Sequence, residues 1–257
     1  MMALNTPPEV YLRANTLKAA REEIIAMLNE QGIEAHPCDE NSEAINAKGS
    51  GIVSNDLYRQ GFYTVQSLSS MIAVKALDPG PGSRVLDLCS APGGKTGYMA
   101  ELMGNEGSIT ACDIYPHRLM LTQAAMKRIG VSICAAEERD AAVYEPSFEG
   151  RFDYVLADVP CSGLGVIASK PEIKLTTDPS RYGELISIQK KILANAIRYA
   201  KPGGRVEYST CTLNKNENEA VVKDVLSKAC SSARIVEMAT IMPYNGKVGF
   251  FYTIIEK

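Results

Sequence analysis

The stretch Arg84–Thr96, which reads RVLDLCSAPGGKT, constrains the fold of this chain more than any other. An apolar run, Val85–Leu88, ends in a loop with one proline and two glycines, and a helical pattern begins near Lys95. A strand, a glycine loop and a helix start form the first unit of a doubly wound sheet, which binds its ligand at the strand's carboxyl end. Glycine lets the backbone approach that ligand closely. The stretch therefore predicts a site for an adenosine-type cofactor.

The glycine pattern argues against the two commonest nucleotide motifs. The dinucleotide pattern G-x-G-x-x-G is absent, and the triphosphate pattern G-x-x-x-x-G-K-[ST] fails because its first glycine position is Cys89. A ligand other than a dinucleotide or a triphosphate is favoured, and a P-loop nucleotide-binding protein remains an alternative.

Strand and helix patterns alternate from Arg84 onwards. Repeated β-α units predict an α/β fold, a doubly wound Rossmann-like sheet that is mostly parallel and has helices on both faces. Strands are expected at 85–88, 108–112, near 133, and at 152–157, 205–209, near 235 and 250–254, and helices at 65–77, 95–103, 116–129, 185–199 and 217–229.

Residues 1–60 are expected to form a small α+β appendage, a ferredoxin- or RRM-like fragment that faces RNA, and 61–257 the main domain, with the boundary near Gly61. The β-α-β fragment of this appendage, at 10–37, carries Arg13, Lys18 and Arg21, and their pattern favours a solvated helix face over contact with a polyanion. The appendage is expected to comprise a strand at 10–14, a helix capped by Thr16 and running to about residue 31, a return strand at 33–37, and loops and short hairpins at 38–61.

Composition indicates a soluble, cytoplasmic protein. Hydrophobic residues make up 46% of the chain and charged residues 22%, and no run approaches the ~20 apolar residues of a membrane span. The first residues lack the basic region of a secretory signal. The cysteine count of seven is odd and no pair has C-x-x-C spacing, which favours a reducing compartment over a disulfide framework or a zinc site.

The net charge of −3 is unusual for a nucleic-acid-binding protein, because phosphate contacts by basic residues supply much of such a protein's affinity. If RNA is the substrate, the positive charge must be local or come from a partner.

Acidic residues stand at or just beyond the ends of three predicted strands: Asp113, Asp140 and Asp158. The carboxyl ends of parallel strands are where open α/β sheets bind ligands. A carboxylate after the second strand accepts ribose hydroxyls, and Asp140 is placed to receive an adenine amino group. Each alone is more simply a loop or cap residue, but three in succession favour a cofactor site.

Cysteines end the fourth and fifth strands, in the runs PCSG at Cys161 and STCT at Cys211. If those strands are neighbours, the two thiols converge beside the cofactor. A buried lone cysteine is usually an inert small hydrophobe, which is the interpretation for Cys38, Cys112, Cys134 and Cys230, while Cys89 matters through its backbone. Neither histidine lies at a motif, so a Cys-His hydrolase is disfavoured.

Taken together, these motifs resemble those of the Sun-type, RsmB-like RNA cytosine methyltransferases, which transfer a methyl group from S-adenosylmethionine to carbon 5 of cytosine. The paired PCSG and STCT cysteines are the most specific part. The matching stretches are YLRANT (11–16), VQSLSSM (65–71), VLDLCSAPGGKT (85–96), DVPCSGLGV (158–166), KPEIK (170–174), KPGGRVEYSTCT (201–212), NENE (216–219) and GFF (249–251).

The resemblance implies a covalent mechanism, because carbon 5 of cytosine is a poor nucleophile until a thiolate adds at carbon 6. By resemblance Cys211 is that nucleophile, Cys161 assists its release, Asp158 holds the base, and Lys95 lies near it. The implied S-adenosylmethionine contacts are Cys89, Ser90, Ala91, Pro92, Gly93, Gly94, Lys95, Asp113, Arg118, Asp140 and Asp158. The implied substrate is RNA, with ribosomal RNA favoured over transfer RNA.

Three departures from the family pattern bear on RNA affinity and substrate choice. Ser67 stands where the family usually has Asp, the segment after PCSG is poor in Arg, and Lys247-Val248 replace a common Asp-Gly pair. No catalytic position is lost. A non-catalytic RNA-binding or assembly factor is a further alternative, although a scaffold needs neither thiol.

Overall fold

A computed structural model describes residues 9–176, 179–229 and 233–257. Its strands form two sheets, one of four strands in the order β2-β3-β1-β4 and one of seven in the order β10-β11-β9-β8-β5-β6-β7. The strands are β1 (Val10–Ala14), β2 (Glu34–Pro37), β3 (Ala44–Lys48), β4 (Tyr63–Val65), β5 (Arg84–Asp87), β6 (Ser108–Asp113), β7 (Cys134–Glu138), β8 (Phe152–Asp158), β9 (Ala200–Thr210), β10 (Arg234–Ile241) and β11 (Phe250–Glu256).

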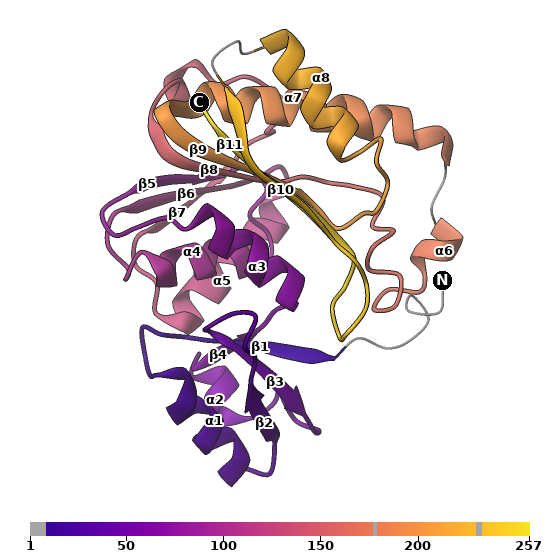
Figure 1. Cartoon of the computed structure of the whole chain (residues 1–257). Helices are drawn as coiled ribbons and strands as arrows, with labels where there is room; N and C mark the ends of the chain where they lie inside the picture. The colour runs from indigo at the N-terminus through magenta and orange to yellow at the C-terminus, as the bar shows by residue number, and fades with distance from the viewer. Residues whose placement is uncertain (1–8, 177–178, 230–232) are drawn as a thin grey trace.

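Helices cover both faces of the large sheet, α3, α4 and α5 on one and α7 and α8 on the other, and the small sheet lies beyond the first group (Figure 1). The helices are α1 (Arg21–Glu30), α2 (Asp56–Arg59), α3 (Leu68–Leu77), α4 (Gly94–Leu102), α5 (Pro116–Ile129), α6 (Ile173–Thr176), α7 (Tyr182–Tyr199) and α8 (Glu219–Ala229), with short 3-10 helices η2 (Pro146–Phe148) and η3 (Pro179–Arg181).

The predicted doubly wound sheet is confirmed. Strands β7, β6, β5, β8 and β9 pair in parallel, while β11 pairs antiparallel with β9 and β10 antiparallel with β11. The chain builds this sheet outward from β5 in both directions. Because the central strands are parallel, they all end at the same edge of the sheet. Side chains that follow β5, β6, β8 and β9 are thereby brought to one place.

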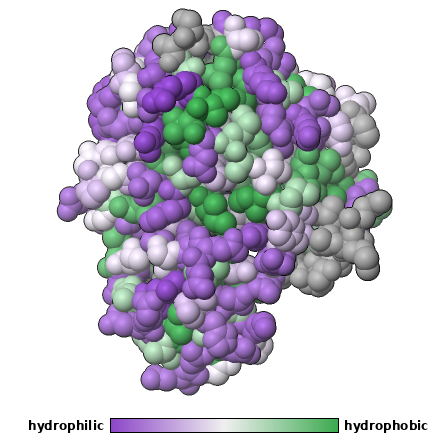
Figure 2. All heavy atoms as spheres, viewed as in Figure 1, coloured by the Kyte–Doolittle hydropathy of each residue, from purple (hydrophilic) through white to green (hydrophobic). Residues whose placement is uncertain are grey.

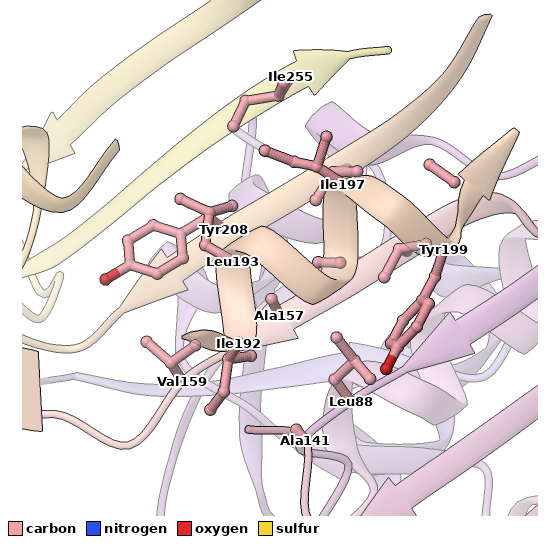
Figure 3. Packing of buried hydrophobic residues seen from close by; sticks show 14 of the residues in the cluster. Leu88, Ala141, Ala157, Val159, Ile192, Leu193, Ile197, Tyr199, Tyr208 and Ile255 are labelled. Carbon is pink, nitrogen blue, oxygen red and sulfur yellow. The ribbon is translucent and has the colours of Figure 1, made fainter. Parts of the chain in front are cut away.

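Helix α7 packs on one face of the sheet through an apolar stripe. Ile192, Leu193 and Ile197 point toward side chains of β8 and β9 such as Ala157 and Tyr208, as Figure 3 shows. These residues recur at helical spacing and are nearly inaccessible to solvent. Burial of this stripe fixes the helix beside the ends of β8 and β9.

Helix α3 packs on the other face, and Ser67 begins it. The Ser67 hydroxyl accepts a hydrogen bond from the Ser70 N–H at 3.3 Å. Serine and aspartate are both favourable at a helix N-cap. The departure from the family's Asp at this position therefore keeps the capping function.

The small sheet extends past the predicted boundary near Gly61, because β4 pairs antiparallel with β1. Arg13 of β1 joins the two parts of the chain. Its guanidinium forms a bidentate ion pair with Glu101 of α4, at 2.7 and 2.8 Å, and it is fully buried. The expectation that Arg13 lies on a solvated face is wrong. We propose that the division between the two domains falls just after β4.

The first helix begins later than its sequence predicts. Thr16 does not cap it; α1 starts at Arg21, and the Ala20 N–H donates to the Glu23 carboxylate at 2.9 Å. The intervening residues form a turn, in which the Leu17 N–H donates to the side-chain oxygen of Asn15 at 3.1 Å. The buried Asn15 amide in turn donates to the carbonyls of Gly61 and Ile129. The polar stretch at 38–61, expected to hold loops and hairpins, also contains α2.

The surface in Figure 2 is mixed, and its lower part, formed by the small N-terminal unit of Figure 1, is mostly hydrophilic. Within the described residues, none of the helices has the length and apolar character that a membrane crossing requires.

Candidate active site

The thiols of Cys161 and Cys211 lie together at one edge of the sheet. Strands β8 and β9 are parallel neighbours, with Asp158 opposite Ser209, so the segments that follow them emerge side by side. The two sulfur atoms are 3.3 Å apart and both cysteines are free. The expected convergence of the thiols is present.

The two thiols differ in acidity. A hydrogen bond from the Cys161 thiol lowers the pKa of Cys211, and it outweighs burial and the charge of Asp158, which act the other way. The same contact, together with burial, raises the pKa of Cys161 well above its ordinary value. When the pair loses one proton, the negative charge is therefore favoured on Cys211, with Cys161 as the hydrogen-bond donor.

Asp158 and Lys95 form an ion pair beside the thiols. The Lys95 ammonium lies 2.6 Å from one carboxylate oxygen of Asp158, and the Ser209 hydroxyl donates to the other at 3.1 Å. Burial is the largest effect on the pKa of Lys95 and would lower it, but the charge and hydrogen bond of Asp158 together with the nearby Glu207 and Cys211 outweigh burial, and the pKa is raised. The ammonium also lies over the ring of Phe250, 5.3 Å from its centre. Lys95 is thus a fixed positive charge next to the thiols.

The glycine loop follows β5 and leads into α4. Gly93 has φ of 101°, a conformation that favours glycine, and a Cβ there would lie 3.1 Å from the Cα of Thr122. The loop is held to the sheet by the Ser90 N–H, which donates to the Cys112 carbonyl at 2.8 Å. Any side chain at Gly93 would strain this position, which explains the glycine.

A cavity of about 430 Å³ opens at this edge of the sheet. Apolar side chains, including Ile188 and Ile192 of α7, form one wall, and both thiols reach it. Of the predicted site residues it is lined by Cys89, Ala91, Asp113, Arg118, Asp140, Asp158, Cys161 and Cys211. The loop residues Ser90, Pro92, Gly94 and Lys95 instead line a neighbouring cavity of about 200 Å³, which also contains Cys89, Ala91 and Asp158.

Arg118 points toward the site and is held there by contacts with two other predicted site residues. Its guanidinium lies 3.4 Å from the carboxylate of Asp113 and donates to the Ala91 carbonyl at 2.9 Å. Asp113 also accepts from the Tyr115 N–H at 3.1 Å, and Asp140 from the Ala142 N–H at 2.9 Å. Both carboxylates therefore face the cavity in fixed orientations.

The chain is similar to known methyltransferases in sequence and in structure. The profile of the 16S rRNA methyltransferase RsmB/F family matches residues 74–253. The chain belongs to the RsmB/F methyltransferase family. The ferredoxin-like domain of RsmF/B-like methyltransferases matches residues 1–53.

Individual relatives agree with this assignment. A probable ribosomal RNA small subunit methyltransferase B of Bacillus subtilis is 40% identical over 84% of this chain and 48% of the relative. A human 28S rRNA (cytosine(4447)-C(5))-methyltransferase is 37% identical over 88% of this chain and 29% of the relative. The chain thus spans about half or less of the length of these relatives.

A methyltransferase homolog protein from Pyrococcus horikoshii has the same fold, with a TM-score of 0.88 and 28% identity. The alignment covers 100% of this chain and 88% of that structure. That solved structure therefore contains counterparts of both the small sheet and the main sheet of this RsmB/F family member.

Glu217 is a site residue that sequence reasoning did not single out. Its buried carboxylate accepts from the Ser162 N–H at 2.9 Å, the Ser162 hydroxyl at 2.6 Å and the Gln189 amide at 3.0 Å. Ser162 in turn contacts the Thr212 hydroxyl at 2.8 Å. One carboxylate thus holds the loop after Cys161 against the loop after Cys211. The signal for Glu217 in the sequence is the NENE run, which is one of the stretches that carry the family resemblance.

Replacing Glu217 by alanine should destabilise the protein by about 3 kcal/mol, because it leaves several buried donors without acceptors. The free energy of unfolding, measured with denaturant, tests this. Asn216→Ala changes an exposed neighbour and serves as the control. A Glu217→Ala protein as stable as the control would contradict the role assigned to this carboxylate.

Of the cysteines expected to be inert, the described ones, Cys38, Cys112 and Cys134, are not among the residues that line the cavity reached by the thiol pair. Burial raises the pKa of Cys112 and of Cys134 to about 12. The pKa of Cys89 is also raised by burial, which agrees with a role for its backbone only. Cys230 lies outside the described residues.

Proposed function

We propose that this chain transfers a methyl group from S-adenosylmethionine to carbon 5 of a cytosine in ribosomal RNA, through a covalent bond between Cys211 and the base. The observation that carries the proposal is the contact of two thiols, 3.3 Å apart, at the wall of a cavity lined by carboxylates. A methyl transfer to an oxygen or nitrogen has no use for a second thiol.

The cavity suits S-adenosylmethionine. Asp113, held by Arg118, would accept the ribose hydroxyls, and Asp140 would receive the adenine amino group, while Ile188 and Ile192 offer an apolar surface to the ring. The backbone of residues 89–95 would hold the remainder of the molecule. When bound, this cofactor supplies an electrophilic methyl group.

Residues of this chain would prepare the cytosine for that methyl group. The thiolate of Cys211 adds to carbon 6, and a proton on ring nitrogen 3, held by Asp158, stabilises the adduct. Carbon 5 thereby gains the electron density that it needs to react. After transfer, a base would take the proton from carbon 5, and the electrons of that bond would form the double bond between carbons 5 and 6. The bond to Cys211 would break to return a thiolate, with Cys161 assisting this release, and the proton on ring nitrogen 3 would return to Asp158.

The substrate class is drawn from the relatives, which are named as ribosomal RNA methyltransferases. Transfer RNA is the second candidate. The net charge of −3 supports a partner that adds RNA affinity. The free thiols agree with a reducing cytoplasm as the place of action.

The function is tested by incubating the protein with S-adenosylmethionine and unmodified transcripts of ribosomal or transfer RNA. We expect 5-methylcytidine at a discrete position of ribosomal RNA, detected by nucleoside mass spectrometry and bisulfite sequencing. Methylation of transfer RNA alone would change the substrate class. Cofactor binding without methylation would favour an assembly factor, and binding of ATP instead would favour a P-loop protein.

A further inference from the structure

A cavity of about 390 Å³ lies between the small N-terminal unit and helix α5, and the proposed chemistry does not use it. Figure 1 shows α5 beside the small unit. Tyr58 of α2 and Thr64 and Val65 of β4 line the cavity from the small unit, and Leu121 and Ala124 line it from α5. Binding sites for small molecules commonly have volumes of ~300–1,000 Å³. The cavity is therefore large enough for a small organic ligand.

This cavity adjoins the proposed active site. Val65, Pro92 and Gly94 line both this cavity and the one of about 200 Å³ that contains Lys95 and Asp158. Val65 and Pro92 are exposed at the surface. A polymer that enters the active site can therefore extend across Val65 and Pro92 into the cavity beside α5.

One wall of the cavity is an apolar face of α5. Leu121 is followed by Ala124 and Ala125, three and four residues later, which is the spacing of side chains on one face of a helix. Leu121 is 54% exposed, and Ala124 is exposed as well. The apolar wall is thus open to solvent, and a ligand with a flat apolar face would bury it.

Arg128 of α5 supplies a positive charge at the same cavity. Its guanidinium group donates to the carbonyls of Tyr58 and Tyr63, at 2.7 and 2.9 Å, and to the Thr64 hydroxyl at 3.0 Å. All three acceptors are neutral. Within the described part of the chain, no carboxylate forms an ion pair with Arg128.

The carboxylate close to Arg128 does not neutralise it. Glu101 is near enough to act on the guanidinium group, but it is engaged in the bidentate ion pair with Arg13. Arg13 also lines the cavity. Two guanidinium groups thus share one carboxylate, which leaves one positive charge without a counterion. A partly buried charge of this kind favours the binding of an anion.

An apolar wall beside a guanidinium group fits the two parts of a nucleotide. A base has flat apolar faces that pack on such a wall, and a phosphate accepts hydrogen bonds from the guanidinium group. An enzyme that modifies a base takes that base out of its stack. The neighbouring base thereby loses a stacking partner, and a cavity beside the active site can replace that contact.

We propose that this cavity is a subsite for a nucleotide next to the target cytosine in the RNA. The base of that nucleotide packs against Leu121 and Ala124, and its phosphate binds Arg128. This rests on the proposed function, which makes RNA the substrate. The subsite also supplies the local positive charge that a chain of net charge −3 needs for contact with RNA.

The subsite is tested first by placing a carboxylate in it. Ala124→Glu adds a negative charge one helical turn before Arg128, where it can pair with the guanidinium group and obstruct the base. The dissociation constant for a fluorescein-labelled, single-stranded fragment of ribosomal RNA, measured by fluorescence anisotropy, should rise about ten-fold. The matched control is Gln123→Glu, which adds the same charge at an exposed neighbour outside the cavity. Its dissociation constant should change by less than about two-fold.

A second variant tests the phosphate contact. Arg128→Gln removes the positive charge, so the slope of log Kd against log salt concentration should fall by about one. Arg128→Lys keeps the charge and should keep the slope. Lys223→Gln removes an exposed charge from α8, on the other face of the sheet, and is the control. Circular dichroism and S-adenosylmethionine binding show that Arg128→Gln is folded.

The outcomes separate this subsite from the proposed function. If Ala124→Glu binds RNA as tightly as Gln123→Glu, or if Arg128→Gln keeps the wild-type salt slope, the subsite is overturned while methylation by the wild type stands. In a wild-type protein that makes no 5-methylcytidine, weaker RNA binding by both variants rejects the proposed function and keeps the nucleotide site. Where methylation occurs, Ala124→Glu should raise the KM for RNA about ten-fold and leave kcat within about two-fold.

Discussion

Replacing Cys211 by alanine should lower the rate of cytosine methylation by more than about a thousand-fold, because no other group in the site can take over the addition to carbon 6. Cys161 is in contact with it, 3.3 Å away, but its raised pKa keeps it protonated. The measurement is methyl transfer to RNA under single-turnover conditions. A denaturing gel should show no covalent protein–RNA species.

The matched control is Cys38→Ala, which removes a free thiol of the small N-terminal unit. Its rate should equal that of the wild type. S-adenosylmethionine binding by Cys211→Ala should also persist, since the carboxylates at Asp113 and Asp140 are untouched. A Cys211→Ala protein with more than about a tenth of the wild-type rate would show that no bond to this sulfur is needed.

Much of the main sheet could be predicted because its signals are local. Helix α5 spans Pro116–Ile129, the bounds that its sequence suggests, since Pro116 starts it and Gly130, with φ of 85°, ends it. The thiol contact could be predicted for a related reason. Once β8 and β9 are recognised as neighbouring parallel strands, the residues that follow them must meet.

Features that depend on distant parts of the chain could not be predicted. Arg13 looks like a surface charge in sequence, but its partner Glu101 is 88 residues away and becomes a neighbour only after folding. The start of α1 is displaced for the same reason, because Asn15 bonds to backbone carbonyls of Gly61 and Ile129. Local patterns carry no information about such contacts.

Two buried acidic residues near the site give one example of each kind, one that could not be predicted from the sequence and one that could. Glu217 lies in a loop, where a charged residue is ordinary, and its role appears only when two other loops meet around it. Glu207 does leave a signal, because an acid stands between Val206 and Tyr208 in the buried part of a predicted strand. The alternation of faces along β9 explains it: the residues on either side of Glu207, Val206 and Tyr208, belong to the opposite core.

Replacing Cys161 by alanine should have the opposite effect on the covalent species, which should accumulate in place of free methylated RNA. Addition by Cys211 can still proceed, whereas release of the base lacks the thiol that assists it. The adduct is measured as a slowly migrating protein–RNA band in a denaturing gel. Its RNA should contain methylated cytosine after the protein is digested.

The hydrogen bond between the thiols predicts how fast that band forms. The Cys161 thiol lowers the pKa of Cys211, so in Cys161→Ala the adduct should form more slowly at neutral pH and faster as the pH rises. Cys161→Ser keeps a hydrogen-bond donor, although its hydroxyl matches the sulfur of Cys211 less well than a thiol does. Its rate of adduct formation should lie between those of the wild type and Cys161→Ala. The double variant with Cys211→Ala should give no band. If Cys161→Ala and Cys211→Ala behave alike, with neither trapping RNA, the two sulfurs do not divide addition and release between them.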